Sequence, residues 1–397
     1  MYLQTVVESE VINMKDVFIV GCKGIPANYG GYETFVENLT KRQINKDIKY
    51  HVACLGDEAK EYEHNNAHCF RLNVPHIGPA RAMQADIDAF EYIIKYVKKN
   101  SIKEFTVLVL ACRIGIVFKK YVNKVHKLGG KVIVNPDGHE WLRSKWSKPI
   151  KKYWRYSEEK MVKYADFLIC DSLNIEKYIQ EEYKKYNPKT TFIAYGADVA
   201  KSIIDADDHW VDDWMKEKGI TKNNYYLIVG RFVPENNYET MIKEFMKSNS
   251  KKDLVIVTNY KDNKLYDTLK DKLHFENDSR IKFVGTVYQP EYIKNIRENA
   301  YGYLHGHSVG GTNPSLLEAL ASTKLNLLYD CGFNKEVGQD SSLYWNLEDG
   351  NLSSLIDKCD KLSDEEISKY NLLSTQVIVD RYNWKLIISN YEKELIA

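Results

Sequence analysis

Short apolar runs alternate with amphipathic stretches along the first half of the chain. The runs are brief and rich in β-branched and aromatic residues, as in buried strands, and they cover residues 17–20, 50–55, 106–111, 131–135 and 167–170. Between them, a helix is expected around Phe35, and residues 85–98 and 114–128 have the three- and four-residue apolar spacing of helices. Strands that alternate with helices predict a parallel sheet with helical crossovers.

The same alternation restarts after an interruption over residues 194–208, where the pattern weakens and acidic residues gather. New apolar runs follow at residues 226–229, 254–257, 281–284 and 300–304. A chain of 397 residues also exceeds the usual size of a single core. We therefore predict an α/β protein whose two doubly wound domains face each other across a cleft. The ligand site is expected at the carboxyl ends of the strands.

Composition and charge narrow the class of protein. The formal net charge of +1 gives no global attraction to nucleic acid, so we expect no nucleic-acid partner. The seven cysteines are widely spaced and form no CxxC pair, which favours reduced thiols and a cytoplasmic location. No apolar run is long enough to cross a bilayer. Residues 1–13 lack the basic start and apolar core of a signal peptide, and we expect an appended tail or an alternative start there.

The most informative segment is YGYLHGHSVGGTNPSLLEALA, residues 301–321. It predicts a strand, a loop with paired glycines, and a helix with Asn313 as N-cap and Pro314 at its first position. The free N–H groups of such a helix start suit a diphosphate. Glu318 lies one turn further on the same face, where it can accept a hydrogen bond from a sugar hydroxyl. The segment therefore predicts a nucleotide-sugar site, with ligand contacts expected from Gly311, Thr312, Asn313 and Glu318.

Two other loops are expected to face this site. Gly30 and Gly31 end a long strand-to-helix loop that lacks the GxGxxG spacing. Close backbone approach to a ligand and a plain turn are equally good interpretations of these glycines. Arg231 follows an apolar strand and Gly230, so we expect its guanidinium to bind a diphosphate rather than to be a surface charge.

His305 and His307 lie two residues apart at a strand end. A zinc site needs further ligands, and no Cys, Asp or Glu stands nearby in the sequence, so we expect no metal. His305 is either a contact to phosphate or sugar, or a structural residue. The DxD pairs Asp86–Asp88 and Asp205–Asp207 resemble carboxylate pairs that hold divalent ions, but we expect both to be solvated.

Residues 135–156 combine two kinds of candidate. Asp137 and His139 follow a strand, where they can contact an acceptor hydroxyl or act as a base. Residues 143–156 mix lysine and arginine with tryptophan, which suits an anionic membrane surface. A nucleic-acid patch and a solvated basic helix with buried tryptophans are the alternatives, and we place membrane contact slightly ahead of the solvated helix.

These residues together resemble glycosyltransferase family 4, which has the GT-B fold of two Rossmann-like domains. The resemblance covers the chain from Met14. It rests on PANYGGYETFVENL, which looks like the family's diphosphate-lining loop, on AYGAD at 194–198, GRFVPENNYETMI at 230–242 and RIKFVGTV at 280–287, and on RYNWKLIISNYEKEL at 381–395. It implies an acceptor-side domain at 14–198, a donor-binding domain at 199–380, and a C-terminal helix at 381–397 that returns to the first domain.

The chain departs from the family pattern at two positions. The family often carries two glutamates seven residues apart, and here Glu318 stands at the second position but Gly310 at the first. A lysine commonly follows the arginine, and here that position is Asn236. The diphosphate would then depend on Arg231, on backbone N–H groups near Gly311–Asn313, and on His305.

The combination GIPANYGGYETFVENL, NPDGHEW and HGHSVGGTNPSLLEA is similar to bacterial β-1,4-rhamnosyltransferases of capsule and cell-wall polysaccharide assembly. This resemblance implies retaining transfer of L-rhamnose from dTDP-L-rhamnose to a glucose or N-acetylglucosamine on undecaprenyl diphosphate. The protein would be peripheral on the inner face of the plasma membrane and would need no metal and no cofactor. Arg231 would neutralise the leaving diphosphate, Gly30 and Gly31 would complete its site, and Asp137 and His139 would meet the acceptor.

Two alternatives stay open. A UDP-sugar-dependent glucosyl- or galactosyltransferase would show the same pattern, because the sequence does not separate the nucleotides. The absence of the glutamate and the lysine would also fit a non-catalytic partner that binds a sugar nucleotide.

Overall fold

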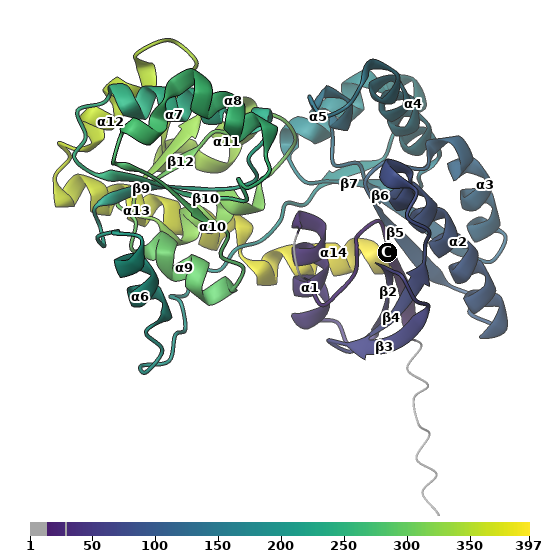
Figure 1. Cartoon of the computed structure of the whole chain (residues 1–397). Coiled ribbons are helices and arrows are strands. Elements are labelled where there is room, and N and C mark those ends of the chain that lie inside the picture. The colour runs from purple at the N-terminus through teal and green to yellow at the C-terminus, as the bar shows by residue number, and fades with distance from the viewer. Residues whose placement is uncertain (1–13, 28–29) are drawn as a thin grey trace, which may run out of the picture.

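The computed structural model describes residues 14–27 and 30–397, which form two α/β lobes side by side (Figure 1). The sheet of the first lobe has the strand order β3-β4-β2-β1-β5-β6-β7-β8. All neighbouring strands are parallel except β3 and β4. The strands are β1 Lys15–Val20, β2 Ile48–Gly56, β3 Lys60–His64, β4 Ala67–Asn73, β5 Phe105–Leu110, β6 Gly130–Asn135, β7 Phe167–Cys170 and β8 Thr190–Phe192.

Strand β1 shows why this sheet is buried on both faces. Val17 and Ile19 point into one apolar cluster, and Phe18 and Val20 point into another. All four side chains are fully buried, as expected for a parallel strand with helices on both sides. The first face is covered by α1 Gly31–Lys41 and α14 Trp384–Ile396, and the second by α2 Arg81–Lys99, α3 Gly115–His126, α4 Lys148–Tyr164 and α5 Leu173–Glu182.

The sheet of the second lobe has the order β11-β10-β9-β12-β13-β14 and is parallel throughout. Its strands are β9 Tyr225–Val229, β10 Asp253–Val257, β11 Ile281–Gly285, β12 Gly302–His305, β13 Asn326–Tyr329 and β14 Leu343–Trp345. Helices α7 Tyr238–Lys247, α8 Lys264–Leu273 and α12 Asn351–Cys359 cover one face, and α6 Trp210–Glu217, α9 Pro290–Glu298 and α10 Pro314–Ser322 the other. Helices α11 Gly332–Gly338 and α13 Asp364–Val377 complete the lobe.

This architecture confirms the predicted pair of doubly wound domains, with strands the pattern did not predict. The β3–β4 hairpin is joined by Asn65 and Asn66, both with positive φ, as a two-residue turn requires. The dipeptide Asn-Asn was the available signal for this turn. Strands β8, β13 and β14 are only three or four residues long, too short for a periodicity to stand out.

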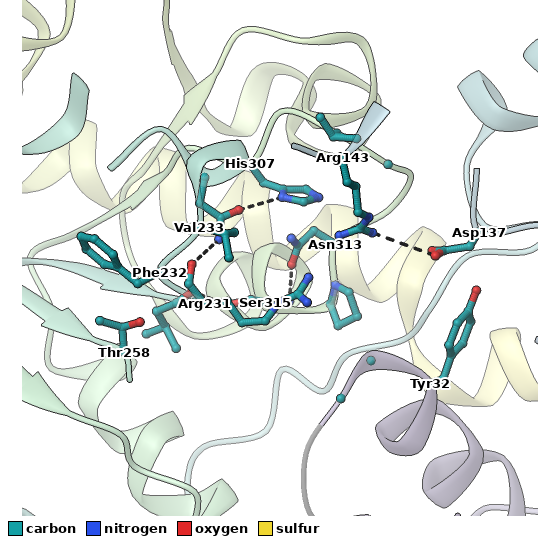
Figure 2. Close-up of a pocket in the computed structure, with 18 of the residues that line it drawn as sticks. Tyr32, Asp137, Arg143, Arg231, Phe232, Val233, Thr258, His307, Asn313 and Ser315 are labelled. Carbon is teal, nitrogen blue, oxygen red and sulfur yellow. Dashed lines mark hydrogen bonds and ion pairs between the residues drawn. The ribbon is translucent and has the colours of Figure 1, made fainter. Parts of the chain in front are cut away.

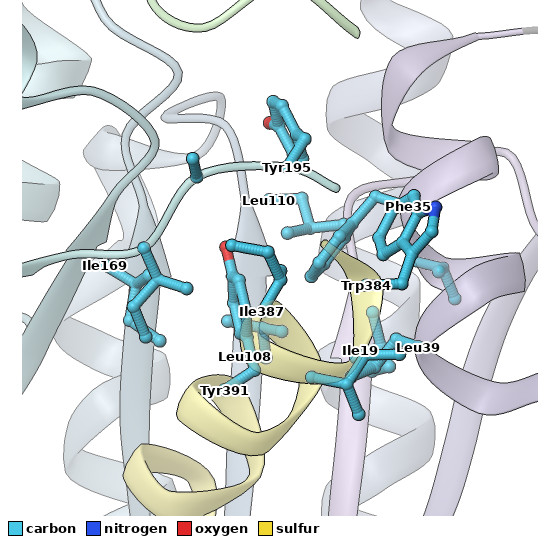
Figure 3. Packing of buried hydrophobic residues seen from close by; sticks show 14 of the residues in the cluster. Ile19, Phe35, Leu39, Leu108, Leu110, Ile169, Tyr195, Trp384, Ile387 and Tyr391 are labelled. Atoms are coloured by element: carbon cyan, nitrogen blue, oxygen red, sulfur yellow. The ribbon is translucent and has the colours of Figure 1, made fainter. Parts of the chain in front are cut away.

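The last helix, α14, packs into the core of the first lobe (Figure 3). The Tyr391 ring of α14 is fully buried and lies 4.6 Å from the ring of Phe35, measured between centroids. The Glu392 carboxylate accepts hydrogen bonds from the backbone N–H groups of Ile44 and Asn45, at 2.9 and 2.8 Å. The chain thus leaves the first lobe after β8 and re-enters it at α14.

One prediction about the first lobe was wrong. Asp86 was expected to be solvated at a helix start, but its side chain is buried inside α2. Its carboxylate lies 3.2 Å from the guanidinium of Arg113, and the same guanidinium donates to the carbonyl of Gly21. Asp205 and Asp207, in contrast, are exposed as predicted.

Candidate active site

A cavity of about 1140 Å³ lies between the lobes. It is formed by the loops at the carboxyl ends of the strands and by the start of α10, as the fold predicts (Figure 2). From the first lobe it is lined by Gly30, Gly31, Tyr32, Arg113, Asp137, Arg143 and Asp171, and from the second by Arg231, His305, His307, Gly310, Gly311, Thr312, Asn313 and Glu318, among others.

Helix α10 begins as predicted. Asn313 is the N-cap and its side chain accepts a hydrogen bond from the Ser315 N–H at 2.9 Å, while Pro314 occupies the first position. Glu318 lies one turn further, where its carboxylate is 2.6 Å from the buried guanidinium of Arg297. Arg297 therefore orients the carboxylate at the cavity wall. Sequence reasoning did not single out this arginine.

The side chain of Arg231 is exposed in the cavity directly after β9. Its backbone carbonyl accepts hydrogen bonds from the Val233 N–H at 3.0 Å and from the Asn236 side-chain amide at 2.7 Å. These two bonds fix the turn from which the guanidinium projects. Asn236, at the position where the family commonly has lysine, is thus part of the support for Arg231.

The paired glycines of the first lobe face α10 across the cavity. A Cβ added to Gly31 would lie 3.7 Å from Cγ of Pro314, so the two loops are at van der Waals distance. The loop before them is held by α1: the Glu33 carboxylate accepts from the Lys23 N–H at 2.6 Å, and that of Glu37 from the Ala27 N–H at 3.0 Å. Residues 28 and 29 of the predicted motif lie outside the described residues.

Direct contacts join the lobes around the cavity. The Thr312 hydroxyl donates to the backbone carbonyl of Asp171, so this predicted ligand-contacting group is engaged between the lobes. Gly311 lies so close to the Asp171 carboxylate that a Cβ would be 2.0 Å from its Oδ1 atom. The Ser144 hydroxyl donates to the Glu235 carboxylate at 2.8 Å, and the Glu336 carboxylate accepts from the start of α5.

The cavity wall opposite Arg231 contains several buried ionisable side chains. Burial raises the pKa of Asp137, although the guanidinium of Arg143, 4.0 Å away, opposes the shift. Asp171 is 3 % exposed, its Oδ1 atom has no hydrogen-bond partner among the described residues, and burial together with Asp137 raises its pKa well above the ordinary value. Burial also raises the pKa of Tyr32. This wall can hold a proton or bind a hydroxyl.

Asp171 and Arg113 were not identified from the sequence. Each follows a buried strand, β7 and β5, so the rule that drew attention to Asp137 would have found them.

His139 does not join Asp137 in the cavity. Its backbone has a left-handed conformation with φ of 54°. Its ring lies 4.0 Å from the ring of Tyr178 and 5.8 Å from that of Trp141, measured between centroids. Burial lowers its pKa. His139 is not among the described residues that line the cavity. The expected contact between His139 and the acceptor therefore does not agree with this geometry.

His305 and His307 both line the cavity, although β12 ends at His305. His305 is buried. Its pKa is lowered to about 3, mainly by this burial and to a smaller extent by the neighbouring His307. His307 is held through its Nδ1 atom, 2.8 Å from the side-chain oxygen of Asn236. Within the described residues, no group of three or more His, Cys, Asp or Glu side chains is placed to hold a metal ion.

Residues 143–156, here called the basic segment, join the cavity to the outer surface of the first lobe. Trp146 and Trp154 line the cavity, with centroids 5.9 Å apart, beside the partly exposed Ile150. Lys148 and Lys152, one turn apart on α4, are exposed. None of the helices in the part of the chain that the structure describes is both long and apolar enough to span a bilayer.

Two family models match the chain, one for each lobe. Residues 14–198 match a domain of unknown function, DUF1972, and residues 211–376 match the family described as Glycosyl transferases group 1. No curated protein sequence matches the chain significantly.

Several solved structures share the fold at low sequence identity. The sucrose-phosphate synthase of Thermosynechococcus elongatus is 14% identical with a TM-score of 0.78, and the match covers 96% of this chain and 98% of that one. HepE of Anabaena in complex with UDP is 12% identical with a TM-score of 0.69, covering 96% and 99%. The E. coli trehalose-6-phosphate structure bound with UDP-2-fluoro glucose is 10% identical with a TM-score of 0.70, also covering 96% and 99%.

At such low sequence identities, these structures establish the fold alone. The family match identifies the type of domain that forms the second lobe. Residues 211–376 form a glycosyl transferases group 1 domain, in a chain that has the GT-B fold of two Rossmann-like lobes.

Proposed function

We propose that the protein is a retaining glycosyltransferase that moves L-rhamnose from dTDP-L-rhamnose to a lipid-linked glucose or N-acetylglucosamine in surface polysaccharide synthesis. The main support is the geometry of the cavity. The start of α10, the guanidinium of Arg231 and the carboxylate of Glu318 line it from one lobe, and Gly31 faces them from the other. This arrangement suits a diphosphate with a sugar on one side and a nucleoside on the other.

The transfer step breaks the bond between the anomeric carbon and the diphosphate and forms a bond from that carbon to an acceptor oxygen. Negative charge grows on the departing diphosphate, so donors already aimed at it lower the barrier. In this proposal those donors are Arg231 and the backbone N–H groups of Gly311–Asn313, the loop that leads into α10. The acceptor hydroxyl lies near Asp137, in the wall that can receive its proton.

The lipid part of the acceptor is assigned to the basic segment. Trp146, Trp154 and Ile150 give the cavity an apolar wall toward α4. Outside it, Lys148 and Lys152 are exposed near Tyr156, which is 44% exposed. Basic and aromatic side chains together suit an anionic membrane surface. We propose that the protein works at the inner face of the plasma membrane with an undecaprenyl diphosphate-linked acceptor.

The nucleotide of the donor has a second candidate, which one observation favours. Two of the similar structures were solved with UDP or a UDP-sugar. A UDP-dependent glucosyl- or galactosyltransferase on the same kind of acceptor is therefore the alternative. Thermal-shift titration with dTDP and UDP separates the two, because the nucleotide bound more tightly by the native state raises the melting temperature more.

The direct test uses purified protein with dTDP-L-rhamnose and short-chain lipid-linked glucose or N-acetylglucosamine, analysed by mass spectrometry. We expect a product heavier by one deoxyhexose, and a loss of turnover on the order of a hundredfold in Arg231→Ala. Transfer only from UDP-hexoses would establish the alternative. Nucleotide binding without transfer to any acceptor would instead indicate a non-catalytic partner.

A further inference from the structure

Two histidine rings, those of His305 and His307, line the cavity beside Gly310. Their centroids lie 6.2 Å apart. His305 is 5 % exposed, and its Nε2 atom has no hydrogen-bond partner within the described residues. Buried polar atoms in folded proteins are nearly always partnered. An unpartnered nitrogen in a cavity wall therefore indicates a ligand that supplies the missing partner.

The hydrogen bonds of Asn236 determine which nitrogen of His307 carries the proton. The Asn236 side-chain nitrogen donates to the Arg231 carbonyl at 2.7 Å, so its side-chain oxygen is the atom that faces His307, 2.8 Å from Nδ1. A carbonyl oxygen can only accept, and Nδ1 of His307 must donate. In the neutral ring this leaves Nε2 with a lone pair and no hydrogen.

Gly310 keeps the space in front of that nitrogen open. A Cβ added to Gly310 would lie 3.6 Å from Nε2 of His307. The backbone φ of Gly310 is 121°, a conformation that strongly favours glycine, so a side chain is disfavoured there for conformational reasons too. A longer side chain at this position would occupy the space that a ligand group next to Nε2 needs.

The surroundings keep the His307 ring uncharged. Burial lowers its pKa to about 3, and the guanidinium groups of Arg143 and Arg231 act in the same direction. A hydrogen bond with the backbone of Val309 raises the pKa and is outweighed. On the remaining side the ring packs against Phe333, 5.8 Å away between centroids. Nε2 therefore keeps its lone pair near neutral pH.

We propose that His307 is a specificity-determining residue for the donor, whose Nε2 atom accepts a hydrogen bond from one ring hydroxyl of an uncharged sugar. Asn236 is its positioning residue, and Gly310 provides the room for the hydroxyl. His305 contributes a second uncharged nitrogen to the same subsite. This inference rests on the proposed function, because it assumes that the cavity binds a nucleotide-sugar. It assigns the sugar subsite to neutral imidazoles and a glycine.

The test is a thermodynamic cycle that combines a change in the donor with a substitution in the protein. Affinities of the parent nucleotide-sugar and of its 2-, 3- and 4-deoxy forms are measured by calorimetry for the wild type and for His307→Phe, which keeps a ring but has no lone pair. We expect one deoxy donor to bind the wild type about fivefold to tenfold more weakly, the scale of one hydrogen bond between neutral groups. In His307→Phe that deoxy donor and its parent should bind equally.

The same ratio in wild type and variant would overturn the inference. Because the cycle uses binding, it is run with dTDP-L-rhamnose or with the UDP-sugar that the protein prefers. A preference for UDP-glucose would thus defeat the rhamnosyl proposal and still test His307. Circular dichroism and melting temperature check that the variant is folded.

A second variant tests the orientation even if His307→Phe does not fold. Asn236→Asp places a carboxylate beside Nδ1, which raises the pKa of His307 and favours the charged ring. Charging the ring uses the Nε2 lone pair, so donor affinity should fall as pH decreases through the raised pKa, an effect that the wild type lacks. Asn237→Asp is the matched control, because Asn237 bonds to the Gly306 carbonyl instead of His307. Identical pH profiles for both variants would contradict the assignment.

Discussion

Replacing Gly311 by alanine should separate the two lobes at the cavity. The added Cβ would lie 2.0 Å from Oδ1 of Asp171 and 2.7 Å from its Cγ. Gly311 is not among the glycines with positive φ, so alanine meets no conformational penalty of its own there. The substitution therefore perturbs the contact between the lobes and leaves the local backbone preference unchanged.

The size of the effect follows from these distances. Ordinary contact begins at 3.4 Å, so Asp171 or the Gly311 loop must move by about 1.4 Å. The Thr312 hydroxyl bonds to the Asp171 carbonyl and moves with this loop. A displacement of about 1 Å of groups that position reactants costs on the order of a hundredfold in rate. No core side chain is lost, so the melting temperature should change little.

The assay is single-turnover transfer, together with small-angle scattering of the nucleotide-bound protein. Gly31→Ala is the matched control, since it is the same chemical change and its Cβ would lie at an ordinary 3.7 Å from Pro314. We expect the scattering dimensions to increase in Gly311→Ala and not in Gly31→Ala. In an Asp171→Ala background, Gly311→Ala should cause no further opening. Wild-type rate and dimensions in Gly311→Ala would refute the reasoning.

Three further predictions concern the first lobe. Asp86→Asn removes the counter-charge of the partly buried Arg113 and should lower the free energy of unfolding by about 3 kcal/mol in urea titrations. Hydrogen bonds from His64 and Asn65 lower the pKa of Glu37 although burial opposes them, so its stabilisation is present above the ordinary pKa and is lost as pH falls through the folded value. The stability advantage of wild type over Glu37→Gln should therefore shrink from about pH 5 to about pH 3. Tyr391→Ala should cost about 4 kcal/mol and Tyr391→Phe about 1 kcal/mol, since its buried ring contributes more than its hydroxyl.

Each of these predictions has an outcome that would contradict it. An unchanged urea midpoint in Asp86→Asn would mean that the ion pair contributes nothing to folding. A constant difference between wild type and Glu37→Gln across the acid range would show that the carboxylate is not stabilised as described. Equal losses in the two Tyr391 variants would assign the effect to the hydroxyl.

The sequence could predict those structural features that are determined by residues close together in the chain. Strands β1 and β9 are nearly uniformly apolar because helices cover both faces, and both were recognised. The start of α10 was predicted correctly because Asn313 and Pro314 act within one turn. Helix periodicity and capping chemistry are properties of neighbours in the chain, so they can be read without coordinates.

The errors and omissions arise from partners that are distant in the chain. Asp86 begins an amphipathic pattern and looks solvent-facing, but its partner Arg113 comes from the loop after β5. Arg297 is recognised only once the structure places it against Glu318. His139 follows a strand as Asp137 does, but its ring packs against Tyr178 of α5. None of these relations leaves a periodic signal in the sequence.

The return of α14 has a consequence for how the protein is made. The strands of the first lobe, residues 15–192, are synthesised before the second lobe, but the Tyr391 and Leu395 side chains that complete their core are synthesised after it. The N-terminal sheet must therefore wait, with one apolar face incompletely covered, until α14 has been synthesised. The elements of the second lobe from α6 to α13 are contiguous in the chain, so we expect this lobe to reach its native state earlier although it is translated later.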